Sequence, residues 1–171
     1  IYLTIIESSQ QETTYIISVT IDSNLIKNSS FEQVENDSLL HWQVISSGTF
    51  NTENSTLALQ GSKVGYFSGL TSSISGREIL SAPFAIESLK PLEASAFFYT
   101  QADPSHTKVS LKIWYFQDEA CTIPASDASN TQRSLNLEAK DSWQKVIYEQ
   151  SADRIPADAL FGKLSIRVMY D

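Results

Sequence analysis

Apolar and polar residues alternate along this chain in short runs that are separated by turn-forming residues. The clearest run, residues 109–116, would place on one side Val109, Leu111, Ile113 and Tyr115. A period of two is typical of strands with one face toward a core, and no window shows the 3.6-residue period of a helix. The sequence therefore predicts an all-β sandwich or barrel. The predicted strands cover residues 1–6, 14–21, 24–26, 41–45, 56–59, 64–67, 79–86, 93–101, 109–117, 132–137, 144–150 and 164–170.

The length favours one domain with a short extension. A chain of 171 residues can bury a proper core. Residues 1–22 hold two β-branched runs around a polar stretch, which predicts a hairpin extension or the edge of a preceding domain. Residues 23–171 would then form the main domain. Because the sequence begins at Ile1 rather than Met, either a leader has been removed or the chain is a piece of a longer protein, and we favour the second.

Composition removes several classes of function. Twenty Asp and Glu against 12 Lys and Arg give a net charge of −8, so no nucleic acid partner is expected. No apolar run approaches the ~20 residues that a membrane-spanning helix needs. One cysteine, Cys121, and two isolated histidines, His41 and His106, leave little material for metal or nucleophilic catalysis. Low charge and abundant Ser, Thr and Asn favour a secreted or cell-surface location.

Two predicted strands carry aromatic residues on the side that their core set leaves free. In residues 92–101 the apolar side holds Leu92, Ala94, Ala96 and Phe98, and the other side holds Phe97, Tyr99 and Gln101. In residues 109–116 the free side holds Lys112 and Trp114. Large aromatic side chains on a solvent face tend to mark binding sites.

A series of motifs gives the chain a family resemblance. Residues 24–32 read Asn-Leu-Ile-Lys-Asn-Ser-Ser-Phe-Glu, and Trp42 follows ten residues later. Together with later segments, these motifs resemble carbohydrate-binding modules grouped as families four and nine. The later matching segments are residues 61–67, 92–99, 143–146 and 155–159.

The resemblance implies a two-sheet antiparallel β-sandwich, a jelly roll with galactose-binding-like topology, over residues 23–171. Ser29 replaces a usual glycine, which is tolerable only if that position does not need φ > 0. The family's closing strand is absent, so residues 1–22 would supply a partner strand or belong to a preceding domain. Trp42 and Trp143 match positions of core aromatics in the family.

The predicted ligand is a polysaccharide or other glycan, bound on the concave sheet face. Sugar rings present an apolar face with hydroxyls around the rim, so a binder needs aromatic platforms and polar rim groups. Trp114, Tyr99 and Phe97 would supply the platforms, and Lys112 and Gln101 the rim contacts. The alternative is that these aromatics pack under a loop or against residues 1–22.

The resemblance also implies a structural Ca²⁺, held by Glu32 with backbone carbonyls and a C-terminal aspartate. Asp171 is the expected second carboxylate, and Asp22 is the other choice. Calcium needs six to eight oxygens, so a solvated Glu32 that ends a strand remains the alternative.

The sequence thus favours a non-catalytic carbohydrate-binding module within a larger secreted or cell-surface protein, whose neighbouring domains would be its partners. The runner-up is a structural spacer or assembly domain, in which residues 1–6 and 14–21 would offer an edge strand. A glycosidase is least favoured. Its carboxylate pair could only be Asp118 and Glu119, which are adjacent and would point to opposite sides of a strand.

Overall fold

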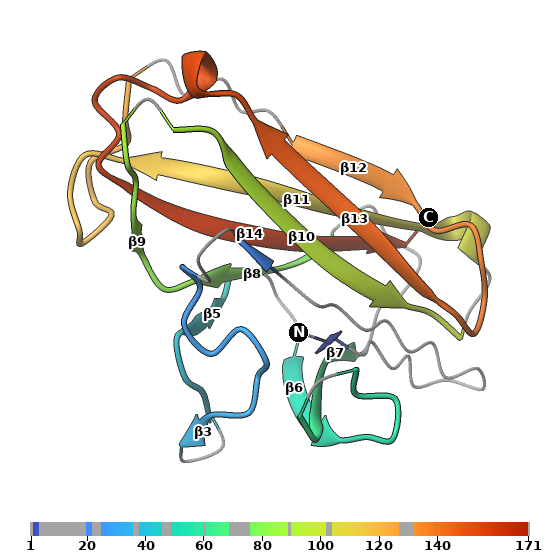
Figure 1. The fold of residues 1–171 in the computed structure, drawn as a ribbon. Coiled ribbons are helices and arrows are strands. Elements are labelled where there is room, and N and C mark those ends of the chain that lie inside the picture. Colours follow the sequence, from blue (N-terminus) through green and yellow to red (C-terminus); the bar gives the residue numbers. More distant parts are fainter. Residues whose placement is uncertain are drawn as a thin grey trace.

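The computed structural model describes residues 2–3, 20–21, 25–35, 38–45, 49–59, 61–68, 76–88, 90–101, 104–126 and 132–170. These residues form a β-sandwich of two large sheets with a jelly-roll arrangement, as predicted (Figure 1). All strand pairs are antiparallel except those of β1, which runs parallel to both of its neighbours.

The first sheet, here sheet I, has the strand order β13-β10-β1-β7-β6. Its strands are β13 (Trp143–Gln150), β10 (Leu92–Tyr99), β1 (Tyr2–Leu3), β7 (Lys63–Ser68) and β6 (Thr49–Asn54). Strand β2 (Thr20–Ile21) also pairs with β10. Both described pieces of residues 1–22 are therefore built into sheet I beside β10.

The second sheet, here sheet II, has the strand order β12-β11-β14-β8-β5. Its strands are β12 (Gln132–Asn136), β11 (Thr107–Phe116), β14 (Phe161–Tyr170), β8 (Arg77–Ser81) and β5 (Trp42–Val44). Strand β9 (Phe84–Ala85) adds to β14.

Three short elements connect the sheets. A two-stranded hairpin is formed by β3 (Val34–Glu35) and β4 (Ser38–Leu39), and the 3-10 helices are η1 (Pro104–His106) and η2 (Ala152–Arg154). The part of the chain that the structure describes contains no helix with the length and hydrophobicity that a membrane crossing requires.

The core lies between the two sheets and matches the predicted faces. Leu92, Ala94, Ala96 and Phe98 of β10 are buried in one cluster with Val109, Leu111, Ile113 and Tyr115 of β11. The alternation of the sequence thus identified the inner faces of both central strands, and the residues between them face outward.

Three predicted strands differ in the structure. Residues 25–26 enter a turn in which Asn28 takes a φ of 50°, a region that asparagine tolerates better than most residues. Residues 56–59 form a turn, in which Leu57 N donates to Ser55 Oγ at 3.2 Å. The predicted strand 79–86 divides into β8 and β9 around Pro83, which has no N–H for the ladder.

Three strands were missed altogether, namely β6 and the two short strands β3 and β4 of the hairpin. Strand β6 reads Thr-Phe-Asn-Thr-Glu-Asn, and Phe50 is its one large apolar residue. This strand pairs with β7 through six residue positions, so its place in the sheet comes from its neighbour and not from its own pattern.

Candidate functional site

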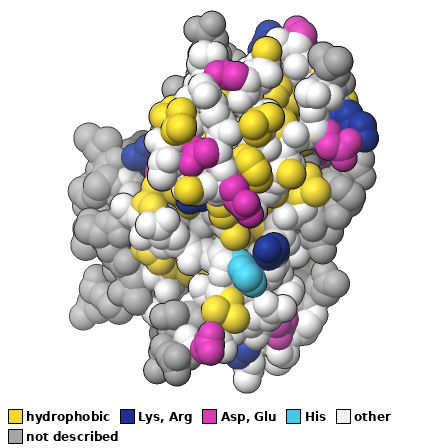
Figure 2. Space-filling view, turned by 90° about the vertical axis from the view of Figure 1, so that its left-hand side faces the viewer, with side chains coloured by type: hydrophobic (Ala, Val, Ile, Leu, Met, Phe, Trp, Pro, Cys, Tyr) yellow, Lys and Arg dark blue, Asp and Glu magenta, His cyan; other side chains and the backbone are white. Residues whose placement is uncertain are grey.

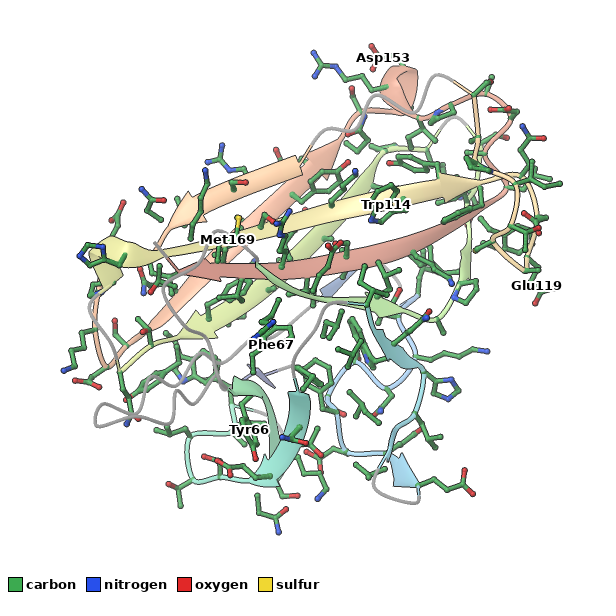
Figure 3. The ribbon with its side chains drawn as sticks, turned by 180° about the vertical axis from the view of Figure 1, so that it is seen from behind. Tyr66, Phe67, Trp114, Glu119, Asp153 and Met169 are labelled. Atoms are coloured by element: carbon green, nitrogen blue, oxygen red, sulfur yellow. The ribbon has the colours of Figure 1, made fainter. Side chains whose placement is uncertain are left out.

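Trp114 stands on the outer face of sheet II. It follows the alternation of β11, in which Val109 to Tyr115 point inward at every second position, and its side chain is 37% exposed. Figure 3 shows Trp114 on β11 in the sheet nearest the viewer. The indole ring is therefore fixed to a central strand and open to solvent on that face.

Lys112 lies beside Trp114 on the same face. Its Nζ is 3.5 Å from the centroid of the Trp114 ring, within the range of a cation–π contact. Burial lowers the pKa of the Lys112 ammonium, against an opposing effect of the Glu78 carboxylate. The predicted platform and the predicted rim donor are thus brought together.

The remaining predicted ligand residues lie on sheet I. Tyr99 is only 8% exposed and its ring centroid is 5.7 Å from that of Trp143. Val64 and the turn residues Leu57 and Ala58 pack against the same two rings. Tyr99 is therefore covered, in line with the alternative that an aromatic side chain packs under a loop.

The polar surroundings of Tyr99 involve Gln101 and Asp141. The side chains of both residues act on the Tyr99 hydroxyl, whose pKa is raised by burial first and then by the charge of Asp141. Phe97 projects from the same face of β10, and Lys145 Nζ lies 5.8 Å from its ring centroid. Phe97, Tyr99 and Gln101 therefore form one group.

The five predicted ligand residues do not form one surface. Trp114 and Lys112 face outward from sheet II, whereas Phe97 and Tyr99 face outward from sheet I, with the core between them. The expectation that Trp114 and Tyr99 share one sheet face is corrected. The reason is that the two strands carry the same pattern but belong to opposite layers.

Trp143 was expected in the core and instead lies on the outer face of sheet I. It pairs with Tyr99 across β10 and β13 and is half-buried. The signal was present in the sequence, because Val146, Tyr148 and Gln150 are the buried positions of β13 and Trp143 has the opposite parity. Trp42, by contrast, packs on the core residue Phe31 as predicted, at 5.2 Å between ring centroids.

Glu32, the predicted metal ligand, accepts hydrogen bonds from residues at the start of β7. Its Oε1 accepts hydrogen bonds from Ser62 N at 2.9 Å and Lys63 N at 2.7 Å, and its Oε2 accepts one from Ser62 Oγ at 2.9 Å. Burial acts to raise the pKa of Glu32, but these bonds and the charge of Lys63 bring it below its ordinary value.

The calcium site at Glu32 stays a prediction, which the described surroundings of Glu32 do not favour. Calcium requires converging oxygens, and the described neighbours of Glu32 are N–H and O–H donors. Within the described ranges no three Asp, Glu, His or Cys residues form a group that could hold a metal ion. Asp171 and Asp22 lie outside the described residues.

Residues of the motif that carried the family resemblance hold a turn together through hydrogen bonds. The Asn28 amide donates to Gln33 O at 2.9 Å and Leu40 O at 2.8 Å, and its Oδ1 accepts from Gln33 N at 2.9 Å. Trp42 Nε1 donates to Asn28 O at 3.1 Å. Ser29 is not among the described residues with positive φ, so the absence of glycine there is tolerated.

The connection after β11 is held by two aspartates. Asp118 accepts hydrogen bonds from Thr122 N, Thr122 Oγ1 and Ile123 N, and Asp158 accepts them from Ser126 and Gln117. The bonds to Asp118, that of Ile123 foremost, lower its pKa. The Asp118 carboxylate therefore closes a turn through its hydrogen bonds, which is a structural role.

The same connection shapes one end of the sandwich. Figure 2 views the end where β9 and the β11–β12 connection lie, and shows hydrophobic side chains interspersed with acidic ones. Ile123 and Leu160, from the segments at this end, are both exposed. Burial raises the pKa of the nearby Cys121 thiol, so this cysteine is not activated.

Comparisons with known proteins bear on the fold. No protein-family model matches the chain, and no curated protein sequence matches it either. The structure is similar to TmCBM61 in complex with β-1,4-galactotriose, with a TM-score of 0.53, 17% identity, and coverage of 84% of this chain and 86% of that chain. The chain thus has the β-sandwich fold of a carbohydrate-binding module.

Two weaker likenesses have TM-scores too low to argue from. One is the K1 cleaved adhesin domain of Lys-gingipain from Porphyromonas gingivalis W83, with a TM-score of 0.42, 11% identity, and coverage of 89% of this chain and 95% of that chain. The other is a carbohydrate-binding module of the β-sandwich superfamily, with a TM-score of 0.31, 13% identity, and coverage of 94% of this chain and 68% of that chain.

Proposed function

We propose that this chain is a non-catalytic carbohydrate-binding module that binds a glycan through Trp114 on the outer face of sheet II. The observation that carries the proposal is an exposed indole ring on a central strand, with a lysine ammonium 3.5 Å from its centroid. The face of the ring that Lys112 does not cover suits the C–H face of a sugar, and the Lys112 ammonium suits sugar hydroxyls.

The fold supports the same function. TmCBM61, whose fold this chain shares, was solved with a galactotriose. The order of sequence motifs further supports a relationship to families four and nine. In this proposal the module belongs to a larger secreted or cell-surface protein and holds neighbouring domains close to a polysaccharide.

The chemistry around Trp114 supports binding without catalysis. Hydrolysis of a glycosidic bond ordinarily needs two carboxyl groups roughly 5–10 Å apart across the scissile bond. Among the described outward-facing residues on the strands of sheet II, Glu78 is the one carboxylate. A sugar on Trp114 would therefore lie beside a single acid, which itself accepts a hydrogen bond from Ser165 Oγ.

The group on sheet I is a weaker candidate. Phe97 is partly accessible, but Tyr99 is covered by Trp143 and by the turn that contains Leu57 and Ala58. A sugar could stack on Tyr99 only after this turn moved. The spacer hypothesis relied on an edge strand at residues 1–6 and 14–21. Of these residues, Tyr2–Leu3 lie between β10 and β7, and Thr20–Ile21 pair with β10.

The test is a glycan array followed by calorimetry with Trp114→Ala. Its matched control is Ile147→Ala, which removes a side chain of similar exposure (40%) from the outer face of sheet I. We expect binding that is lost in Trp114→Ala and kept in Ile147→Ala. Binding that survives in Trp114→Ala and is lost in Phe97→Ala would move the site to sheet I, and silence from folded protein across the array would favour the spacer.

A further inference from the structure

The outer face of sheet II is basic although the protein is acidic. Among the described residues, outward-facing positions on its strands hold four cations and one carboxylate. They are Lys108, Lys112, Lys163, Arg167 and Glu78. One third of the 12 Lys and Arg residues of a chain with net charge −8 thus lie on one sheet face.

The outer face of sheet I has the opposite character. Its described outward-facing strand positions hold three carboxylates, Glu53, Glu93 and Glu149, and one cation, Lys145. The two faces of the sandwich therefore differ in sign, and the uneven charge follows the layers of the fold.

Two of the four cations of sheet II lie beside Trp114. Lys163 is directly opposite Trp114 on β14, and Lys112 is two residues away on β11. Directly opposed side chains in an antiparallel pair have Cβ atoms about 5 Å apart. Arg167 of β14 is opposite Ser110 of β11 and Glu78 of β8, and the Glu78 carboxylate also acts on Lys112.

The lysines nearest the ring are available to a ligand. Neither Lys112 nor Lys163 forms an ion pair with a described residue. The pKa of Lys112 is lowered by burial, which shows that its ammonium is partly desolvated. A negatively charged group placed beside the ring, next to these two lysines, would pair with both ammonium groups.

The net negative charge of the protein does not prevent an anionic group from binding beside Trp114. The two sheets pack about 10 Å apart, so the charged layers on the two outer faces lie roughly 20 Å apart, about two screening lengths at 0.1 M salt. An anion at Trp114 would respond mainly to the lysines beside it and little to the carboxylates of sheet I.

We infer that the glycan of this site is an acidic polysaccharide, whose sugar units carry carboxylate or sulfate groups. This inference rests on the proposed function. The Trp114 ring would take the apolar face of one sugar, while Lys112 and Lys163 would take negative groups on that sugar or its neighbours. Both an aromatic platform and flanking cations are then needed for full affinity.

The experiment measures binding by calorimetry at about 0.1 M and about 0.4 M salt, where screening separates the charge contribution. Its probes are polygalacturonate and dextran sulfate, with neutral β-1,4-galactan, neutral dextran and poly-glutamate as controls. The variants are Trp114→Ala and the double variant Lys112→Gln/Lys163→Gln. The matched control Lys140→Gln/Lys145→Gln removes two exposed charges elsewhere.

We expect an acidic glycan to bind at least about tenfold tighter than its neutral counterpart, and to lose about tenfold in affinity in the Lys112→Gln/Lys163→Gln variant and at high salt. The control double variant should stay within about twofold. Preference for polygalacturonate or for dextran sulfate would identify carboxylate or sulfate as the recognised group.

Three results would overturn the inference, and they differ in what they mean for the proposed function. Neutral galactan bound through Trp114, with no loss in the lysine variant, would keep a carbohydrate-binding module and reject the acidic ligand. Poly-glutamate bound as tightly as the acidic glycans, with no loss in Trp114→Ala, would show general polyanion attraction. Folded protein that binds none of the glycans would reject both.

Discussion

The ammonium group of Lys112 lies 3.5 Å from the centroid of the Trp114 ring, and both side chains project from the same face of β11. This contact fixes a cation beside an exposed aromatic surface. A flexible lysine elsewhere would lose rotamer freedom on meeting a ligand, whereas Lys112 is already ordered by its contact with the ring.

Replacing Lys112 by Met should change stability little. Met keeps the apolar length of the side chain, and a cation–π contact at a partly exposed site contributes about 0.5–1 kcal/mol. Urea unfolding should therefore show a loss below about 1 kcal/mol, close to that of Lys145→Met, whose ammonium lies farther from its ring, at 5.8 Å. A loss above about 2 kcal/mol would assign Lys112 a structural role instead.

Glu32 should make stability depend on pH. Its folded-state pKa is below the ordinary value, so its contribution is present at neutral pH and disappears as the pH falls from the unfolded pKa, about 4.3, through the folded one. Glu32→Gln should lower the free energy of unfolding by about 1–2 kcal/mol at pH 7, and the difference should shrink in acid. The control is Glu149→Gln, an exposed carboxylate of β13. A difference that does not change with pH would show that the charge of Glu32 is unimportant.

Gly61→Ala should be strongly destabilising. Gly61 has a φ of 74°, and a Cβ there would overlap the Glu32 carboxylate. The left-handed conformation alone costs alanine about 1–2 kcal/mol, and the displaced carboxylate adds to this. In a double-mutant cycle, Gly61→Ala should cost less in a Glu32→Ala background than in the wild type. Equal costs in both backgrounds would mean that the backbone conformation is the whole effect.

Asn28 should contribute to stability and not to glycan binding, although it lies in the motif that carries the family resemblance. Asn28→Ala removes three hydrogen bonds, to Gln33 and Leu40, and should lower the free energy of unfolding by about 2–4 kcal/mol. Asn28→Asp can still accept from Gln33 N but cannot donate, and should also be destabilised. Glycan affinity per folded molecule should not change, and a selective loss of affinity in a stable variant would contradict this assignment.

Calcium is a separate test. The predicted Ca²⁺ ligands were Glu32 and Asp171, and a cation at Glu32 would have to displace donors from Ser62 and Lys63. We therefore expect the same melting temperature in chelator and in millimolar Ca²⁺. An increase on adding Ca²⁺ that disappears in Asp171→Asn would establish the metal site that the family resemblance implied.

The alternation of the sequence predicted an all-β sandwich or barrel and the inner faces of β10 and β11, whereas the two-sheet jelly roll was implied by the family resemblance. Each of these strands is long and has a buried position at every second residue, which is the condition under which a period of two can be recognised. Strand β6 lacked this signal. It is held in the sheet by its hydrogen bonds to β7 and by the burial of Phe50.

The candidate site could be predicted only in part. The parity of Trp114 within β11 placed it on the outside correctly, but parity says nothing about which sheet a strand joins. Tyr99 had the same parity signal and is buried, because the turn at Leu57 and Ala58 packs over it from a distant part of the chain. The clustering of Lys112 and Lys163 likewise depends on the register between β11 and β14, which no local pattern contains.

The position of β1 has a consequence for how the chain folds. Leu3 pairs with Gly65 of β7 and with Phe98 of β10, so the middle of sheet I joins three distant parts of the chain. Closing such long loops costs entropy before the new pairs stabilise anything, and proteins rich in distant pairings fold slowly. During synthesis β1 has no partner until β7 has left the ribosome and lacks its second partner until β10 follows, so the middle of sheet I is completed long after its first strand was made.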